Sequence, residues 1–145
     1  MSKARLRAWL EILKVSRSIE ARLRENLRTE FDSTLPRFDV LSALERSENG
    51  LRMSELSDAL MVSNGNVTGI VDRLVQEGSI ERLPVEGDRR ASIVRLTGTG
   101  RARFSEMARV HEGWIDELLG GLSADDIKQL SGILRSVRQS QEVRT

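Results

Sequence analysis

The chain of 145 residues has no cysteine, no tyrosine and only two prolines, and aromatic side chains make up 3% of it. The missing cysteine excludes a disulfide framework, a thiolate metal site and a cysteine-based oxidant sensor. No apolar run approaches the roughly 18 residues that a membrane-spanning helix needs. The first 20 residues are basic but interleave charges with apolar residues, unlike the uninterrupted apolar core of a signal peptide. We therefore expect a cytoplasmic protein without a membrane partner.

Residues typical of catalysis are equally scarce. The one histidine, His111, lies within an expected helix, where a surface or packing role is the common case. The acidic residues stand on helix faces among basic neighbours, and no carboxylate pair has the apolar setting that shifts a pKa. No glycine-rich phosphate loop follows a strand. The sequence therefore predicts no enzyme, no cofactor and no metal site.

The charges nearly balance over the whole chain, with 23 basic and 22 acidic side chains and a net charge of +1. The excess is local, because residues 1–30 hold eight lysines and arginines against four glutamates. Such a segment is either a mildly basic face or a solvated helix with ion pairs four residues apart. Charge alone favours the solvated helix.

Long helices are expected at both ends of the chain. Apolar residues recur at helical spacing from about Lys3 to Thr29 and from about Gly98 to Leu119. A last helix follows Ser123, which can cap it together with Asp126 three residues later. Its apolar residues stand three or four positions apart, at Ile127, Leu130, Leu134 and Val137. That narrow row is typical of a helix that packs against another helix.

The middle of the chain predicts three shorter helices. The first has Ser33 or Thr34 as its N-cap. Ser54 is the expected N-cap of the second, which is short, and Ser63 is the expected N-cap of the third, over residues 63–77. Two helices joined by about three residues, the second polar at its start and apolar at its end, form the pattern of a helix-turn-helix.

The helix expected over residues 63–77 starts with poor helix formers, in the run "SNGNVTG". Small polar residues suit the start of a recognition helix, because its first residues meet base edges in the major groove of DNA. The alternative is a surface helix that starts weakly and packs its glycines against a neighbouring helix. The helix alone leaves the two interpretations open.

The periodicity changes after this helix. Residues Ile80 to Leu83 and Ser92 to Leu96 predict two short strands, joined by the loop "PVEGDRRA". A hairpin directly after a helix-turn-helix is a wing. Arg89 and Arg90 in its loop could enter a narrow minor groove, where the negative potential is enhanced. Asp88 is expected to hold an arginine in place, and a charged, soluble turn is the alternative.

The run "DRLVQEGSIERLPVEGDRRASIVRLTGTG", residues 72–100, resembles the signature of the multiple-antibiotic-resistance regulator (MarR) family. The matching pieces occur in order, and they are Asp72-Arg73-Leu74, Gly78, Arg82, Asp88-Arg89-Arg90, Val94-Arg95-Leu96-Thr97 and Gly100. The resemblance implies a winged helix-turn-helix homodimer that binds pseudo-palindromic double-stranded DNA, usually as a repressor. It also implies that the first helix and the last two form a dimerisation region. A winged-helix module that binds proteins and no DNA is the alternative.

The expected fold is mainly α with a small β-hairpin (α+β). Residues 1–32 and 98–145 are the expected dimerisation region, and residues 33–97 the winged helix-turn-helix, with its recognition helix at about 63–77 and its wing at about 80–97. The expected DNA-binding residues are Ser54, Ser63, Asn64, Gly65, Asn66, Thr68, Gly69, Arg73, Arg82, Arg89 and Arg90. The expected dimer contacts are Leu6, Leu10, Leu13, Ile127, Leu130, Leu134 and Val137. By the resemblance, Asp72 pairs with Arg90 or Arg89 and braces the wing, as Asp88 also does.

The resemblance further implies a small organic effector, such as an aromatic acid or a phenol, in a cleft between the dimerisation and DNA-binding parts. No motif marks the residues of that cleft. The candidates are the aromatic or cationic side chains of the flanking elements, namely Trp9, Phe31, Arg37, Phe38 and Trp114. Packing in the core is the alternative for each aromatic residue.

Overall fold

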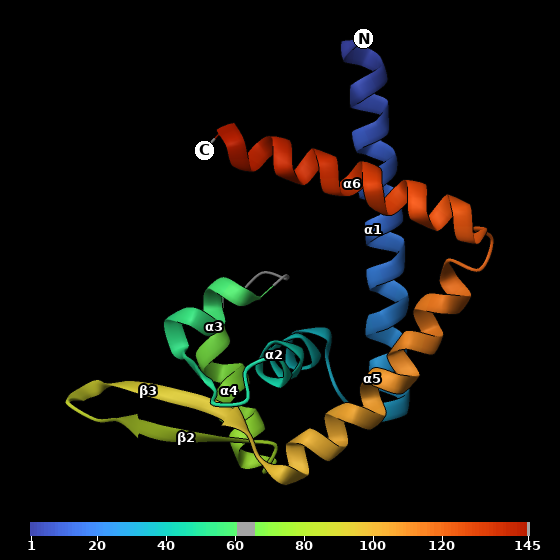
Figure 1. The fold of residues 1–145 in the computed structure, drawn as a ribbon. Coiled ribbons are helices and arrows are strands. Elements are labelled where there is room, and N and C mark those ends of the chain that lie inside the picture. The colour runs from blue at the N-terminus through green and yellow to red at the C-terminus, as the bar shows by residue number, and fades with distance from the viewer. Residues whose placement is uncertain (61–65, 145) are drawn as a thin grey trace. The chain divides into compact units, whose positions relative to one another are not determined.

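The computed structural model describes residues 1–60 and 66–144 of the chain (Figure 1). The elements are α1 (Ser2–Phe31), α2 (Leu35–Glu45), β1 (Leu51–Arg52), α3 (Met53–Ala59), α4 (Val67–Gln76), β2 (Ile80–Val85), β3 (Asp88–Leu96), α5 (Gly98–Leu118) and α6 (Ala124–Arg144). The chain forms two compact units, residues 1–111 and residues 112–145. The mainly helical fold with one small antiparallel sheet confirms the expected fold class.

The corner between α1 and α2 is built from local hydrogen bonds. Asp32 takes the left-handed conformation, with φ of 49°, and the next N–H, of Ser33, donates to the Leu27 carbonyl at 3.1 Å. Aspartate tolerates this conformation better than most residues. Thr34 then caps α2, because its hydroxyl accepts the Arg37 N–H at 3.2 Å. Of the two caps expected here, Thr34 is the one that the structure uses.

A three-stranded antiparallel sheet follows, in the order β1-β3-β2. The hairpin strands are longer than expected, so the loop between them shrinks from the expected eight residues to Glu86 and Gly87. Pro84 lies within β2, which is an edge strand and therefore tolerates a residue without an N–H. The sequence did not predict β1, because two residues are too few to show an alternation.

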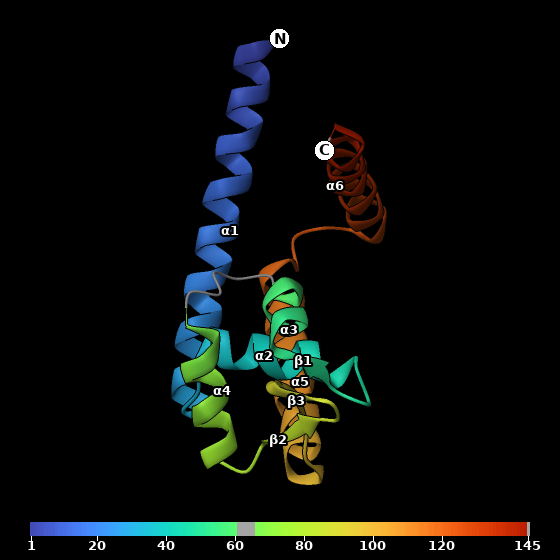
Figure 2. The same ribbon diagram turned by 90° about the vertical axis from the view of Figure 1, so that its left-hand side faces the viewer.

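The core of the first unit lies where α2 meets α3, α4 and the sheet. Figure 2 shows α3 and α4 beside α2, and both helices pack against it. The fully buried side chains come from all of these elements and from α1: Leu27, Val40, Leu44, Leu56, Val71, Leu74, Ile80 and Val94. Full burial of one such side chain stabilises the fold by about 1.5–3 kcal/mol. This core fixes the orientation of α4 and of the hairpin.

The second unit contains the end of α5 and all of α6. The expected cap is confirmed, since the Ser123 hydroxyl accepts the Asp126 N–H at 3.1 Å and the Asp126 carboxylate accepts the Ser123 N–H at 3.0 Å. These contacts with Ser123 hold the pKa of the Asp126 carboxyl below its usual value. The apolar row of α6 lies exposed, with 42–48% of Ile127, Leu130, Leu134 and Val137 open to solvent.

The N-terminal half of α1, in the first unit, is also apolar and exposed. Leu6 is 56% exposed, Trp9 53% and Leu10 42%. Leu13 is only half-buried. Neither this helix nor any other in the described part of the chain is long and apolar enough to cross a bilayer.

Candidate nucleic-acid interface and adjoining cleft

The described part of the expected recognition helix is α4, which starts at Val67 with Asn66 as its N-cap. The Asn66 side chain accepts the Gly69 N–H at 3.3 Å. A Cβ atom on Gly69 would lie 2.6 Å from the Asn66 amide oxygen, so the glycine leaves room for the cap. The cap role expected for Ser63 therefore belongs to Asn66. Three expected DNA-binding residues, Ser63, Asn64 and Gly65, lie outside the described residues.

The two faces of α4 differ in chemistry as expected. The inner face is apolar and buried through Val67, Val71 and Leu74. The exposed polar or charged side chains are Asn66, Thr68, Asp72, Arg73 and Gln76, and the apolar Val75 is also 38% exposed. Such an outer face offers hydrogen-bond donors and acceptors to base edges and phosphates.

The wing is tied to α4 by an ion pair that the sequence did not predict. Asp72 Oδ1 lies 2.9 Å from Arg82 Nη2, and Arg82 stands on β2. The expected pairing of Asp72 with Arg90 or Arg89 is therefore wrong. The partner of Asp72 could not be predicted from the spacing along the chain. The hairpin strands are longer than expected, so Arg89 and Arg90 lie at the far end of the hairpin from α4. Asp72 still braces the wing, through its strand and not through its tip.

The tip of the wing presents two arginines to solvent. The Asp88 carboxylate accepts the backbone N–H of Arg90 at 3.0 Å, so Asp88 shapes the turn and does not hold an arginine side chain. Arg89 and Arg90 are both exposed, and no described residue pairs with their guanidinium groups. The two groups are thus available to an external anion such as a phosphate.

The start of α3 lies beside the wing. Its N-cap is Arg52 and not Ser54, and the Arg52 N–H donates to the Glu55 carboxylate at 2.9 Å. Ser54 is exposed in the first turn. Arg52, Ser54 and Arg90 line one hollow of about 350 Å³. Arg52 is a basic residue of this surface that the sequence reasoning missed, and only the pairing of β1 with β3 brings it there.

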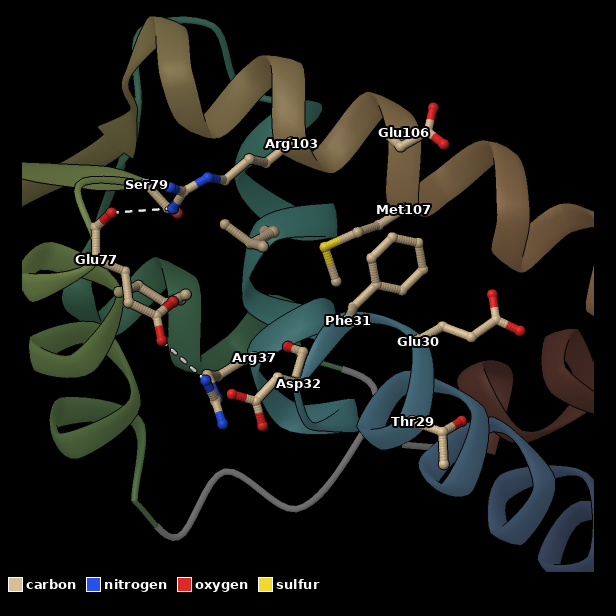
Figure 3. Close-up of a pocket in the computed structure, with 13 residues that line it drawn as sticks. Thr29, Glu30, Phe31, Asp32, Arg37, Glu77, Ser79, Arg103, Glu106 and Met107 are labelled. Carbon is tan, nitrogen blue, oxygen red and sulfur yellow. Dashed lines mark hydrogen bonds and ion pairs between the residues drawn. The ribbon is translucent and has the colours of Figure 1, made fainter.

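A larger cleft, of about 610 Å³, lies within the first unit (Figure 3). It is lined by the end of α1, by α2, by the end of α4 and by α5. Two of the five expected effector-binding residues, Phe31 and Arg37, line it. The sequence reasoning missed its other charged residues, among which Glu77 and Arg103 are joined to each other by a hydrogen bond.

The other three candidates for the cleft do not line it. Trp9 is exposed on α1, which also contradicts the alternative of core packing. Phe38 is a core residue, with its ring centroid 5.4 Å from that of Phe104 and 4.5 Å from that of His111. Burial lowers the pKa of His111, which favours the neutral ring in this stack. Trp114 is buried and belongs to the other unit.

Known proteins with similar sequences and folds agree on one family. The profile of the MarR family matches residues 33–92. The multiple antibiotic resistance protein MarR of Salmonella typhimurium is 33% identical over 117 residues, which are 80% of this chain and 81% of that protein. The chain belongs to the MarR family. Other curated regulators that it matches are longer, and the chain spans 63% and 55% of the length of two of them.

Solved structures of MarR-family proteins share the fold. A MarR family transcriptional regulator from Silicibacter pomeroyi is 31% identical, with a TM-score of 0.83 over 97% of this chain and 96% of that one. A mutant of MarR from E. coli, complexed with operator DNA, is 32% identical, with a TM-score of 0.75 over 87% of this chain and 89% of that one. The winged-helix architecture is therefore that of the MarR family.

The MarR-like signature residues Thr97 and Gly100 hold the end of α4 against the start of α5. The Thr97 hydroxyl donates to the Gly78 carbonyl at 2.6 Å and accepts the Gly100 N–H at 2.9 Å. A Cβ atom on Gly100 would overlap the Ser79 carbonyl, so only glycine fits this close approach. This part of the signature is explained by packing, without any contact to DNA.

Proposed function

We propose that this chain is a sequence-specific DNA-binding transcriptional regulator, which inserts α4 into the major groove and the wing tip into the minor groove. The observation that carries the proposal is the ion pair between Asp72 and Arg82, because it holds the wing and the polar face of α4 in one fixed arrangement. The guanidinium groups of Arg89 and Arg90, which pair with none of the described residues, and the exposed side chains of α4 supply the contacts. The E. coli protein solved with operator DNA supports this use of the fold.

The exposed apolar rows of α1 and α6 support a homodimer. In a single chain, side chains such as Leu130 and Leu134 expose apolar surface to water, which is unfavourable. A second copy of the chain would cover that surface. Two copies related by a two-fold axis present two recognition helices to successive major grooves, about 34–36 Å apart. Residues 1–32 and 98–145 are the proposed dimerisation region, and residues 33–97 the DNA-binding part.

The dimer has its own test. Glutamate at both Leu130 and Leu134 would place unpaired charges in the interface, so we expect the dimer to dissociate. Sedimentation velocity measures the mass in solution. A double variant that still sediments as a dimer would place the interface elsewhere. Glutamate at the exposed Asn49, which lies outside the proposed dimerisation region, is the control that adds a charge elsewhere on the surface.

We further propose that the chain represses transcription and that a small organic effector releases it from DNA. The cleft of about 610 Å³ is lined by apolar side chains such as Phe31 and Met107 and by charged side chains of both signs: Arg37, Arg103, Glu30, Asp32, Glu77 and Glu106. This mixture suits an amphipathic ligand such as an aromatic acid or a phenol. The proposal includes no catalytic step, in keeping with relatives that are named as a transcriptional regulator and a transcriptional repressor. A cytoplasmic location stays a prediction.

A gel-shift titration with promoter fragments of the adjacent genes tests the proposal. We expect one fragment to bind in preference to an unrelated competitor, with an affinity that falls as salt rises, because bound phosphates release counterions. Equal, weak binding to every fragment would contradict it and would favour the alternative of a protein-binding winged helix. A pull-down with the purified protein would then identify the partner.

A further inference from the structure

Glu77, at the C-terminal end of α4, is shared between two arginines. Its Oε1 atom lies 2.9 Å from Arg37 Nη1 and 3.0 Å from Arg73 Nε. Arg37 comes from α2 and lines the cleft, whereas Arg73 lies on the exposed face of α4. One carboxylate oxygen thus joins a residue of the cleft to a residue of the proposed DNA-binding surface.

The backbone of Glu77 is held as well. Arg103 Nη1 donates to the Glu77 carbonyl at 3.0 Å and to the Ser79 hydroxyl at 3.4 Å. Figure 3 shows Arg103 reaching Glu77 from α5, with Arg37 on the other side of the Glu77 carboxylate. The end of α4 therefore depends on two guanidinium groups that both line the cleft.

Arg37 also lines a second hollow, next to α4. It lines this hollow, which measures about 500 Å³, together with Asn66, Gly69, Ile70 and Arg73, which lie along one side of α4. Its Nε atom donates to the Thr34 hydroxyl at 3.4 Å. A change in the direction of the Arg37 side chain would therefore alter the surroundings of these α4 residues.

The pair of Arg37 and Glu77 is more than a surface ion pair. The Arg37 side chain is only 18% exposed, and the Glu77 side chain 31%. Attraction between charges is stronger where water is partly excluded, so Glu77 is a strong internal competitor for any anion that approaches Arg37. An organic carboxylate in the cleft would have to replace one of the contacts of Glu77.

We propose that Glu77 is the positioning residue that couples the cleft to the recognition helix. An organic carboxylate in the cleft binds Arg37 in place of the Glu77 carboxylate, and Arg103 in place of the Glu77 carbonyl. Arg73 and the end of α4 then lose their fixed position, and operator affinity falls. This inference rests on the proposed function, in which α4 binds DNA and the cleft binds an effector. It adds the residue through which the two sites communicate and the charge of the ligand.

The first experiment measures benzoate binding by calorimetry on the full chain without DNA. We expect a dissociation constant of about 1 mM or lower for the unaltered protein, within the reach of a small ligand with a charged contact. Glu77→Gln removes the internal competitor, so benzoate should bind about tenfold tighter. Arg37→Gln should abolish binding. Glu25→Gln alters a matched glutamate–arginine pair on the surface of α1 and should leave the affinity unchanged.

The second experiment measures operator affinity with and without saturating benzoate. We expect benzoate to weaken binding of the unaltered protein by about 5- to 150-fold, and operator DNA to weaken benzoate binding by the same factor. In Glu77→Gln, operator affinity should already be lowered toward that of the benzoate-bound unaltered protein, because Arg37 and Arg73 lose their shared carboxylate. Benzoate should then change it less than about twofold, because the coupling residue is gone. A merely structural role of Glu77 would weaken operator binding without tightening benzoate binding.

Several results would overturn the inference. They are undetectable benzoate binding at about 10 mM, equal benzoate affinities of Glu77→Gln and the unaltered protein, or undiminished inhibition by benzoate in Glu77→Gln. Absence of operator binding before benzoate is added would instead contradict the proposed function. The calorimetric comparison would still decide whether Glu77 and the anion compete for Arg37.

Discussion

The two ends of α4 differ in what holds them. At the N-terminal end the cap is internal, since the Asn66 side chain accepts the Gly69 N–H one turn ahead, and the described polar side chains of the first turn lie open to solvent. At the C-terminal end Glu77 and Ser79 are bonded by side chains from α2 and α5. The difference indicates a helix that is anchored at one end and left accessible at the other. An accessible end suits contact with DNA, and an anchored end suits control of that contact.

The largest effect is expected from breaking the anchored end. In Gly100→Ala the added Cβ atom overlaps the Ser79 carbonyl. This carbonyl belongs to the backbone, so it cannot shift without distorting the chain around it. We expect the free energy of unfolding to fall by about 1–3 kcal/mol, as for other overpacked sites. Urea denaturation measures it. Gly98→Ala, two residues earlier with no atom within 4 Å of its added Cβ, is the matched control and should change little.

A smaller effect is expected from the accessible end. Asn66→Ala removes the cap of α4, and we expect a loss of about 1 kcal/mol in the free energy of unfolding. Asn66→Ser keeps an N-cap oxygen and should restore most of it. A stability equal to that of the unaltered protein in Asn66→Ala would mean that the cap does not hold this end.

The smallest effect on stability is expected from the brace between α4 and the wing. Arg82 is 37% exposed and Asp72 54%, so Arg82→Gln should lower the free energy of unfolding by less than about 1 kcal/mol. Operator affinity should fall more than stability does, because the wing loses its fixed position. Arg95→Gln breaks the comparable pair with Glu81 on the sheet and is the control. Equal losses of operator affinity in both variants would mean that the Asp72–Arg82 pair matters no more for DNA binding than the Glu81–Arg95 pair.

The sequence predicted some of the features that depend on near neighbours, although α3 is capped by Arg52 in place of Ser54 and α4 by Asn66 in place of Ser63. The helix caps at Thr34 and Ser123 are set by residues within a few positions of one another, so spacing and residue type were sufficient. The pairs between distant elements were missed or wrong. Asp72 meets Arg82 only because the strand register places Arg82 beside α4, and Arg37 meets Glu77 across 40 residues of chain.

The candidate cleft shows the same limit. Phe31 and Arg37 were predicted because they lie on elements that flank the cleft, but the same criterion also selected Trp9, which is exposed, and Phe38, which is in the core. Residue type cannot tell which face of a helix turns toward a cleft. That depends on how α1, α2 and α5 pack in three dimensions.

Operator affinity of Arg90→Ala tests the central claim most directly, since Arg90 is exposed at the wing tip and its side chain has no described partner. Fluorescence anisotropy with a bound promoter fragment measures the affinity at several salt concentrations. We expect a loss of about 1–3 kcal/mol in binding free energy, a shallower salt dependence and an unchanged free energy of unfolding. Unchanged affinity and salt dependence would contradict it, because the wing tip would then be only a charged turn.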